Sequence, residues 1–420
     1  MLFRFFVVLL WCAPAVVFAG DRIQNSADDW PWWRGPNRDG VAAADQSPPL
    51  EWSEEKNVLW KTPIAGRGHG SPTVVGNRVY LATADEAAET QSVLCFDRNS
   101  GNLLWSTDVH QGGLAAGKEP NGKSSWASAS VACDGERLFI NFLNNHAAHT
   151  TALDLAGKQL WQKKVTDYEI HQGYGSSPAI YGPLVIVTAD NKLGGAVAAF
   201  DRKTGDQVWK VKRPQLPNYP SPIVVNAAGQ DQVVIVGCDL VTSIAPLTGK
   251  KIWEIEGATT ECVTSTVTDG QVVITSGGYP DNHISAVRAD GTGEVMWRNT
   301  TRVYVPSMLV KDKYLYAVAD AGVAICYDMA TGKEAWKGRL GSTFTSSPVL
   351  VGENIFVTSD DGQTVIYKAS PDGYELVGKN KLADQVVATP TFCGSRIYMR
   401  AATFEGDRRQ EFLYCLGKAK

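Results

Sequence analysis

Two histidines, His146 and His149, stand three positions apart in the segment NNHAAH. A His-x-x-His pair on a hairpin can hold a metal ion when a third ligand converges on it, and His110 and His171 are the candidate third ligands. Such a centre would support a metal-assisted hydrolase or lyase. The alternative is that these imidazoles are polar tips of loops, and the need for three converging ligands favours it.

A second candidate is the pair Asp190 and Asn191, in the segment TADN (188–191). Carboxylate and amide oxygens suit a hard cation such as calcium. The alternative is turn chemistry, because Asp and Asn side chains cap local backbone at the end of a strand.

Both candidates lie in a sequence that repeats. Each unit has a Ser-Pro-type strand start, apolar and alternating strands, and a Gly turn followed by Trp. The period of about forty to fifty residues indicates stacked units of one architecture. The turn-plus-Trp half reads CFDRNSGNLLW (95–105), ALDLAGKQLW (152–161), AFDRKTGDQVW (199–209), IAPLTGKKIW (244–253), AVRADGTGEVMW (286–297) and CYDMATGKEAW (326–336).

The periodicity within a unit is two, which indicates strands and hairpins and therefore an all-β protein. Eight strand starts predict an eight-bladed β-propeller of four-stranded blades. The strand at 57–64 has no blade of its own, so we expect it to pair with the last blade, 388–417, and close the ring. The repeated Trp is expected to pack between neighbouring blades.

On a propeller, the blade-to-blade connections lie on the same face as the loops between second and third strands, and this chain has its long loops there. We expect aromatic and imidazole side chains near each strand start to surround the mouth of the central channel. They could stack a flat ligand or hold an extended peptide, or they could simply plug the channel. The candidates are His69, Trp126, Tyr174, Tyr219 and Tyr304.

The first residues, MLFRFFVVLLWCAPAVVFAG, combine a cation, an apolar run and a small-residue cleavage pattern. They predict a signal peptide over 1–19 and an exported product, periplasmic or secreted, with no transmembrane segment. Residues 20–57 contain WPWWRGPNRDG, which we interpret as an extended strap packed on the side of the barrel. The propeller is expected over 58–417.

Composition limits the possible partners. The formal net charge is −4, from 40 basic and 44 acidic residues, so a nucleic acid is not expected. Of the eight cysteines, Cys95, Cys326 and Cys415 share one slot of the repeat, where a thiol is expected to be a small buried hydrophobe. We expect the protein to be a monomer.

With these repeats the chain resembles the PQQ-like propellers, a family that includes quinoprotein alcohol dehydrogenases and the outer-membrane assembly factor BamB. It is most similar in appearance to exported PQQ-like propeller proteins of planctomycete-type bacteria. The resemblance covers residues 58–417 and implies the propeller fold. The enzymes of the family carry an adjacent Cys pair beside the quinone, a Trp floor beneath it and Glu, Asn and Asp around calcium. This chain has no adjacent Cys pair.

Three hypotheses follow. The first is a non-catalytic binding or scaffold protein that recognises a protein or glycan partner on the loop-rich face, with no cofactor. The second is a quinoprotein-like oxidoreductase that binds PQQ and calcium, with Asp190 and Asn191 as candidate ligands. The third is the metal-assisted hydrolase or lyase of the histidine face.

Overall fold

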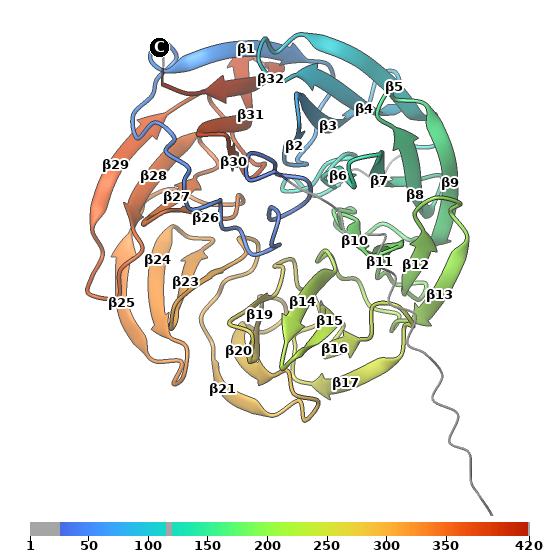
Figure 1. Cartoon of the computed structure of the whole chain (residues 1–420), viewed down its shortest axis with the longest axis vertical. Helices are drawn as coiled ribbons and strands as arrows, with labels where there is room; N and C mark the ends of the chain where they lie inside the picture. The colour runs from blue at the N-terminus through green and yellow to red at the C-terminus, as the bar shows by residue number, and fades with distance from the viewer. Residues whose placement is uncertain (1–25, 115–119, 419–420) are drawn as a thin grey trace, which may run out of the picture.

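The structure is a computed structural model that describes residues 26–114 and 120–418. The predicted signal peptide, 1–19, lies outside the described residues. The described chain forms eight four-stranded antiparallel sheets, which stand around a central channel like the blades of a propeller (Figure 1). The predicted all-β, eight-bladed propeller is therefore confirmed.

The first four blades follow one another along the chain, each starting with its innermost strand. Their strands are β2 (Thr73–Val75), β3 (Arg78–Asp85), β4 (Thr90–Asp97) and β5 (Leu103–Gln111); β6 (Ala132–Cys133), β7 (Arg137–Asn144), β8 (Ala147–Asp154) and β9 (Gln159–Asp167); β10 (Ala179–Tyr181), β11 (Leu184–Ala189), β12 (Ala196–Asp201) and β13 (Gln207–Lys212); β14 (Ile223–Ala227), β15 (Gln230–Gly237), β16 (Leu240–Ile244) and β17 (Lys251–Glu256).

The next three blades repeat this order, and the last blade takes its outermost strand from the start of the propeller. Their strands are β18 (Val267–Thr268), β19 (Val272–Gly277), β20 (His283–Arg288) and β21 (Val295–Asn299); β22 (Leu309–Lys311), β23 (Tyr314–Ala319), β24 (Val323–Asp328) and β25 (Glu334–Arg339); β26 (Val349–Val351), β27 (Asn354–Thr358), β28 (Gln363–Lys368) and β29 (Leu376–Lys381); β30 (Thr391–Cys393), β31 (Arg396–Glu405), β32 (Arg408–Leu416) and β1 (Val58–Ile64).

The ring closes by pairing of the two ends of the propeller. Strand β1 lies antiparallel to β32, with Val58 opposite Leu416 and Ile64 opposite Glu411. Figure 1 shows the first and last strands, in blue and red, side by side in one blade. The predicted closure is confirmed, and the hydrogen bonds of a sheet thus hold the first blade-forming segment against the last.

The repeated Trp joins neighbouring blades. The indole N–H of Trp60 donates to the carbonyl of Arg98 in the next blade, and that of Trp105 donates to the carbonyl of Leu155, each at 3.2 Å. The turn glycine of the next blade lies against the ring, since a Cβ on Gly101 would stand 2.5 Å from Trp60. The Trp and Gly of the repeat are therefore a packing device.

The strap does not lie on the side of the barrel, and that expectation is wrong. It crosses the channel on the side away from the long loops, and Figure 1 shows it in blue over the centre of the ring. Trp30 forms a bridge with Val74 of the first blade, and Val41 forms one with Leu350 of the seventh. The reason is that the innermost strand of a blade has one edge without a strand partner, and a chain crossing the channel can pair its backbone with that edge.

Side chains of the strap fix it to further blades. The Arg34 side chain is buried and donates to the carbonyls of Asp39, Met308 and Pro348. The indole N–H of Trp33 donates to Ser265 Oγ at 2.8 Å. Strap contacts thus reach the first, fifth, sixth and seventh blades at once, so the strap acts as a plug that also ties the ring together.

The seven cysteines among the described residues are free and buried. Cys95 and Cys326 stand opposite Trp105 and Trp336 on the neighbouring strand, where a small side chain leaves room for the indole.

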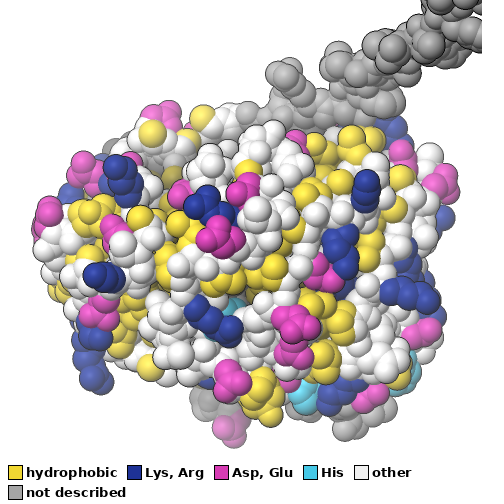
Figure 2. Space-filling model, turned by 90° about the horizontal axis from the view of Figure 1, so that it is seen from below, with side chains coloured by type: hydrophobic (Ala, Val, Ile, Leu, Met, Phe, Trp, Pro, Cys, Tyr) yellow, Lys and Arg dark blue, Asp and Glu magenta, His cyan; other side chains and the backbone are white. Residues whose placement is uncertain are grey.

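The described part of the chain has no helix that is long and apolar enough to span a membrane. Figure 2, an edge-on view, shows acidic, basic and hydrophobic side chains interspersed over the rim.

Candidate functional site

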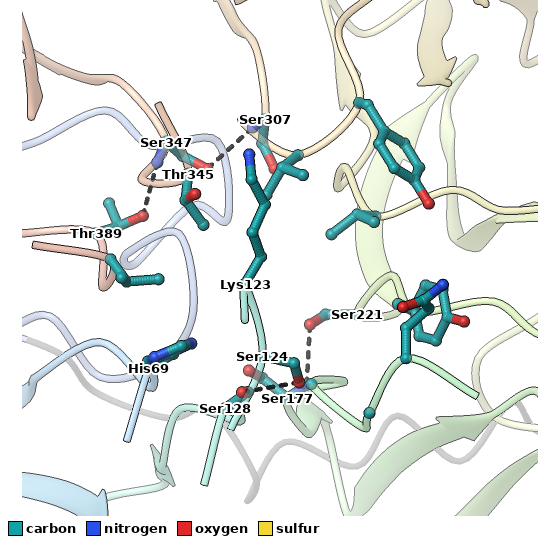
Figure 3. A pocket seen from close by; sticks show the side chains of 18 of the residues that line it. His69, Lys123, Ser124, Ser128, Ser177, Ser221, Ser307, Thr345, Ser347 and Thr389 are labelled. Carbon is teal, nitrogen blue, oxygen red and sulfur yellow. Dashed lines mark hydrogen bonds between the residues drawn. The ribbon is translucent and has the colours of Figure 1, made fainter. Parts of the chain in front are cut away.

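A cavity of about 310 Å³ occupies the channel on the loop-rich face. Its walls come mainly from the connections that lead from the outermost strand of one blade to the innermost strand of the next, and Trp33 of the strap lines it as well. Because the strap crosses the other end of the channel, the cavity is a pocket that opens toward the long loops. Figure 3 shows it from close by.

Four of the five predicted channel-mouth residues line this cavity, namely His69, Tyr174, Tyr219 and Tyr304. Trp126 does not line it. Its side chain is 7% exposed and belongs to the hydrophobic core of the first blades, while Gln91 donates to its backbone carbonyl at 2.8 Å. The long connection between β5 and β6 presents other residues to the cavity instead.

The tyrosines are held in different ways. Tyr174 is buried and donates from its hydroxyl to the carbonyl of Thr188 at 2.9 Å, so only its ring is left for a ligand. The hydroxyl of Tyr304 donates a hydrogen bond to Glu261 Oε2 at 3.3 Å. Burial and the nearby Glu261 carboxylate raise the pKa of Tyr219 and of Tyr304, so both are neutral hydroxyl groups at physiological pH.

His69 is the most strongly perturbed imidazole of the cavity wall. It is 8% exposed, and its Nε2 lies 3.5 Å from a guanidinium nitrogen of Arg67. Burial lowers the pKa of His69 from 6.5 to about 3, and the charges of Arg67 and Arg400 act in the same direction. His69 is therefore a neutral group at physiological pH.

This shift gives a testable dependence of stability on pH. Below pH 6.5 the unfolded chain binds a proton at His69 and the folded chain does not, so stability falls as pH falls from 6.5 toward 3. Urea unfolding at several pH values measures this dependence. We expect the free energy of unfolding of His69→Gln to fall less steeply than that of the parent between pH 6.5 and pH 3. His146→Gln, which changes an exposed imidazole, is the matched control. Equal slopes for His69→Gln and the parent would contradict the assignment.

Asp190 is not at the cavity. Its side chain is 2% exposed and forms an ion pair with Arg213 at 3.2 Å. Asn218 donates to the same carboxylate at 3.1 Å, and the thiol of Cys238 lies 3.5 Å from it. The carboxylate is thus already surrounded by donors, which leaves no coordination position directed at a cation.

Asn191 caps local backbone. Its amide nitrogen donates to the carbonyls of Asp167 and Ala189, and its Oδ1 accepts from the backbone N–H of Leu193 at 2.9 Å. Asn191 therefore caps the end of a strand, as expected if the Asp-Asn pair belongs to a turn and not to a cation site. Asp190 and Asn191 therefore do not fit a calcium site of the quinoprotein kind.

The histidines of the candidate metal centre are not brought together. His110 and His149 are neighbours, with ring centroids 5.2 Å apart, and burial lowers the pKa of both. His146 is exposed in the turn between β7 and β8, and His171 Nε2 lies 3.1 Å from Glu261 Oε1. Over residues 26–114 and 120–418 no three His, Cys, Asp or Glu side chains are grouped to hold a metal ion.

Sequence reasoning missed several residues of the cavity. Lys123, Arg302 and Asp320 line it, as does a ring of hydroxyl groups from the strand starts. The repeated Ser was visible in the sequence, but it indicated only where a strand begins. Lys123 carried no signal, because it lies in a long Gly- and Lys-rich connection whose path the repeat does not determine.

A comparison with protein families agrees with the propeller fold. A family model described as outer membrane protein assembly factor BamB matches residues 41–166, 89–279 and 280–376. The chain belongs to this BamB family. One relative is the outer membrane protein assembly factor BamB of Bordetella pertussis, which is 24% identical over 374 residues, covering 82% of this chain and 86% of that protein.

Solved structures show the same fold in BamB and in enzymes. BamB from Moraxella catarrhalis superposes with a TM-score of 0.60 at 14% identity, covering 85% of this BamB-family chain and 99% of that chain. Quinohemoprotein alcohol dehydrogenase from Comamonas testosteroni superposes with a TM-score of 0.66 at 13% identity, covering 96% of this chain and 82% of that chain. At these identities the likeness concerns the fold alone.

Proposed function

We propose that this BamB-family chain is a non-catalytic scaffold protein of the cell envelope, which helps to assemble other proteins and binds a segment of a protein partner in the channel cavity. Family membership supports the assembly role, because the matching family and the Bordetella relative are both named as outer membrane protein assembly factors. Export through the predicted signal peptide would place the protein in the periplasm. A glycan is the other partner class.

The observation that carries the proposal is the form of the cavity. It is closed at its base by Trp33 and open on the loop-rich face, and its volume of about 310 Å³ is that of a ligand pocket. Tyrosine rings and Ser and Thr hydroxyl groups both line its wall. Such a wall suits an extended peptide, whose side chains pack on the rings while its backbone accepts and donates hydrogen bonds.

The acidic groups near the channel support a binding role over a catalytic one. Asp190 is paired with Arg213, and Glu411 is paired with Arg400, in each case with both side chains at most 2% exposed. Glu261, at 4% exposed, accepts hydrogen bonds instead of facing solvent. These carboxylates act as internal structural partners, whereas a quinoprotein centre would need them gathered around a cation.

The proposal is tested by site-specific photocrosslinking in cells. A photoreactive amino acid at Tyr304, on the cavity, is expected to capture one discrete envelope protein, and the same amino acid at Leu247 is not. Leu247 is 50% exposed on a turn at the opposite end of the blades and is the matched control. Equal capture from both positions, or capture from neither, would contradict the proposal.

The quinoprotein alternative is tested on the purified protein. We expect PQQ with calcium to leave the melting temperature unchanged and to produce no dye-linked oxidation of alcohols. A melting temperature that rises by several degrees only when both calcium and PQQ are present, together with alcohol oxidation, would replace the scaffold proposal with that of an oxidoreductase.

A further inference from the structure

The strand-start hydroxyl groups form a hydrogen-bonded ring at the base of the cavity. At six of the eight blade junctions, the backbone N–H of one strand-start residue donates to the hydroxyl oxygen of its counterpart in the next blade, at 2.9 to 3.0 Å. The acceptors are Ser130, Ser177, Ser221, Ser307, Ser347 and Thr389. Dashed lines in Figure 3 mark the bonds between Ser177 and Ser221, between Ser307 and Ser347, and between Ser347 and Thr389.

In each of these bonds the hydroxyl is the acceptor, so its own proton is free to be donated. No protein acceptor for any of the six protons is found in the described chain, and all six residues line the cavity. Ser221 and Thr389 are the most exposed of them, at 9% and 8%. The base of the cavity therefore offers hydrogen-bond donors rather than acceptors.

Lys123 brings a positive charge to the same space. It lies on the connection between β5 and β6, and in Figure 3 its side chain extends over the middle of the cavity. Its backbone N–H donates to Asn121 Oδ1, but its ammonium group has no ion pair or hydrogen bond within the described residues. An ammonium group without a partner at the centre of a pocket is available to a ligand.

The other charges of the wall do not cancel this one. Arg302 lies over the ring of Tyr304, with the guanidinium carbon 4.9 Å from the ring centroid, and donates to the carbonyl of Gly278. Asp320 is the one acidic side chain that lines the described cavity, and its Oδ2 accepts from the backbone N–H of Tyr304 at 2.8 Å. The lining thus has two cations against one engaged carboxylate.

Resting on the scaffold function proposed above, we infer that the cavity recognises a carboxylate of the partner segment, held by the ammonium group of Lys123 above the ring of hydroxyl donors. A carboxylate is acceptor-only and negatively charged, so it accepts hydrogen bonds from the nearest of these hydroxyl groups and pairs with the ammonium charge. The tyrosine rings and Trp33 then contact the apolar parts of the same segment. The occupant is therefore an acidic stretch or a chain terminus of a protein.

The test uses two short peptides labelled with a neutral dye, and measures binding by fluorescence anisotropy. One peptide contains Glu residues and a free terminal carboxylate, and its counterpart has Gln at those positions and a terminal amide. We expect the acidic peptide to bind at least tenfold more tightly and to weaken as salt is added. Equal affinities would overturn the inference.

Variants of the full chain then locate the contact. Lys123→Met is expected to weaken binding of the acidic peptide about tenfold, the size of one charge-assisted hydrogen bond, and Lys123→Arg is expected to retain it. Lys250→Met removes an exposed cation from a turn at the opposite end of the blades and should change nothing. If Lys123→Met and Lys250→Met bind equally well, the inference is wrong.

Two further arms separate this inference from its alternatives. Inorganic phosphate and acetate are compared as competitors of the acidic peptide, and phosphate is expected to displace it no better than acetate does. Selective displacement by phosphate would indicate a phosphorylated ligand in place of a carboxylate. If the two peptides bind equally while crosslinking from Tyr304 still captures a partner, the carboxylate inference fails and the scaffold function stands. If crosslinking also fails, the scaffold function falls with it.

Discussion

Replacement of Asp190 by Ala is expected to lower the free energy of unfolding by about 3–5 kcal/mol, because it leaves the buried guanidinium of Arg213 without its counter-charge. Both side chains are 2% exposed. Arg213 would keep hydrogen bonds to Thr242 Oγ1 at 2.9 Å and to the carbonyl of Gly237 at 3.0 Å, and neither carries a formal charge. Urea unfolding measures the loss.

A double variant and a calcium titration complete this experiment. Asp190→Leu combined with Arg213→Met removes both charges, so it should recover much of the stability lost by Asp190→Ala. Calcium should not alter the stability of the parent protein. A loss below about 1 kcal/mol for Asp190→Ala, as for an exposed ion pair, together with stabilisation of the parent by calcium, would show instead that Asp190 is a cation ligand.

Replacement of Arg34 by Met is expected to cost about 3–5 kcal/mol and to release the strap. The side chain is buried, and its charged guanidinium donates to three backbone carbonyls, so its removal breaks several buried hydrogen bonds at once. Two of these carbonyls, those of Met308 and Pro348, would remain in the sixth and seventh blades without a donor. Thermal unfolding and amide hydrogen exchange of residues 30–42 measure the two effects.

Lys56→Met is the control for Arg34→Met, since Lys56 also belongs to the predicted strap. Its ion pair with Glu51 is exposed, with the two side chains 59% and 74% accessible, so its loss should cost under about 1 kcal/mol. Because Trp33 adjoins Arg34, the Arg34→Met variant should also lose affinity for a ligand of the cavity. Unchanged hydrogen exchange in the strap of Arg34→Met would contradict its role as an anchor.

The repeat made the fold predictable, and it did so through spacing. A Trp on each outer strand and a Ser at each strand start set the number of blades, and the spare strand at 57–64 predicted the pairing of β1 with β32. The same spacing predicted that His69, Tyr174, Tyr219 and Tyr304 lie around one opening. These predictions depend on the periodicity of the repeat, which can be read from one sequence without a structure.

Features outside the repeat could not be predicted in the same way. The path of the strap depends on where the innermost strands leave unpaired edges along the channel, and that is a property of the closed ring. Trp126 lies in the core because the connection between β5 and β6 is long enough to turn it away from the channel. The partner of Asp190, Arg213, lies on another segment, and nothing in the sequence TADN identifies it.

The pairing of β1 with β32 has a consequence for the order of folding. The first strand of the propeller has to wait for one of the last segments to be synthesised, because its partner residues are 411–416. Until then the nascent chain carries an open arc whose first and last edges are both unpaired, and open strand edges attract other chains. A holding factor, or delivery of the chain in unfolded form, would protect this arc until its final strand arrives.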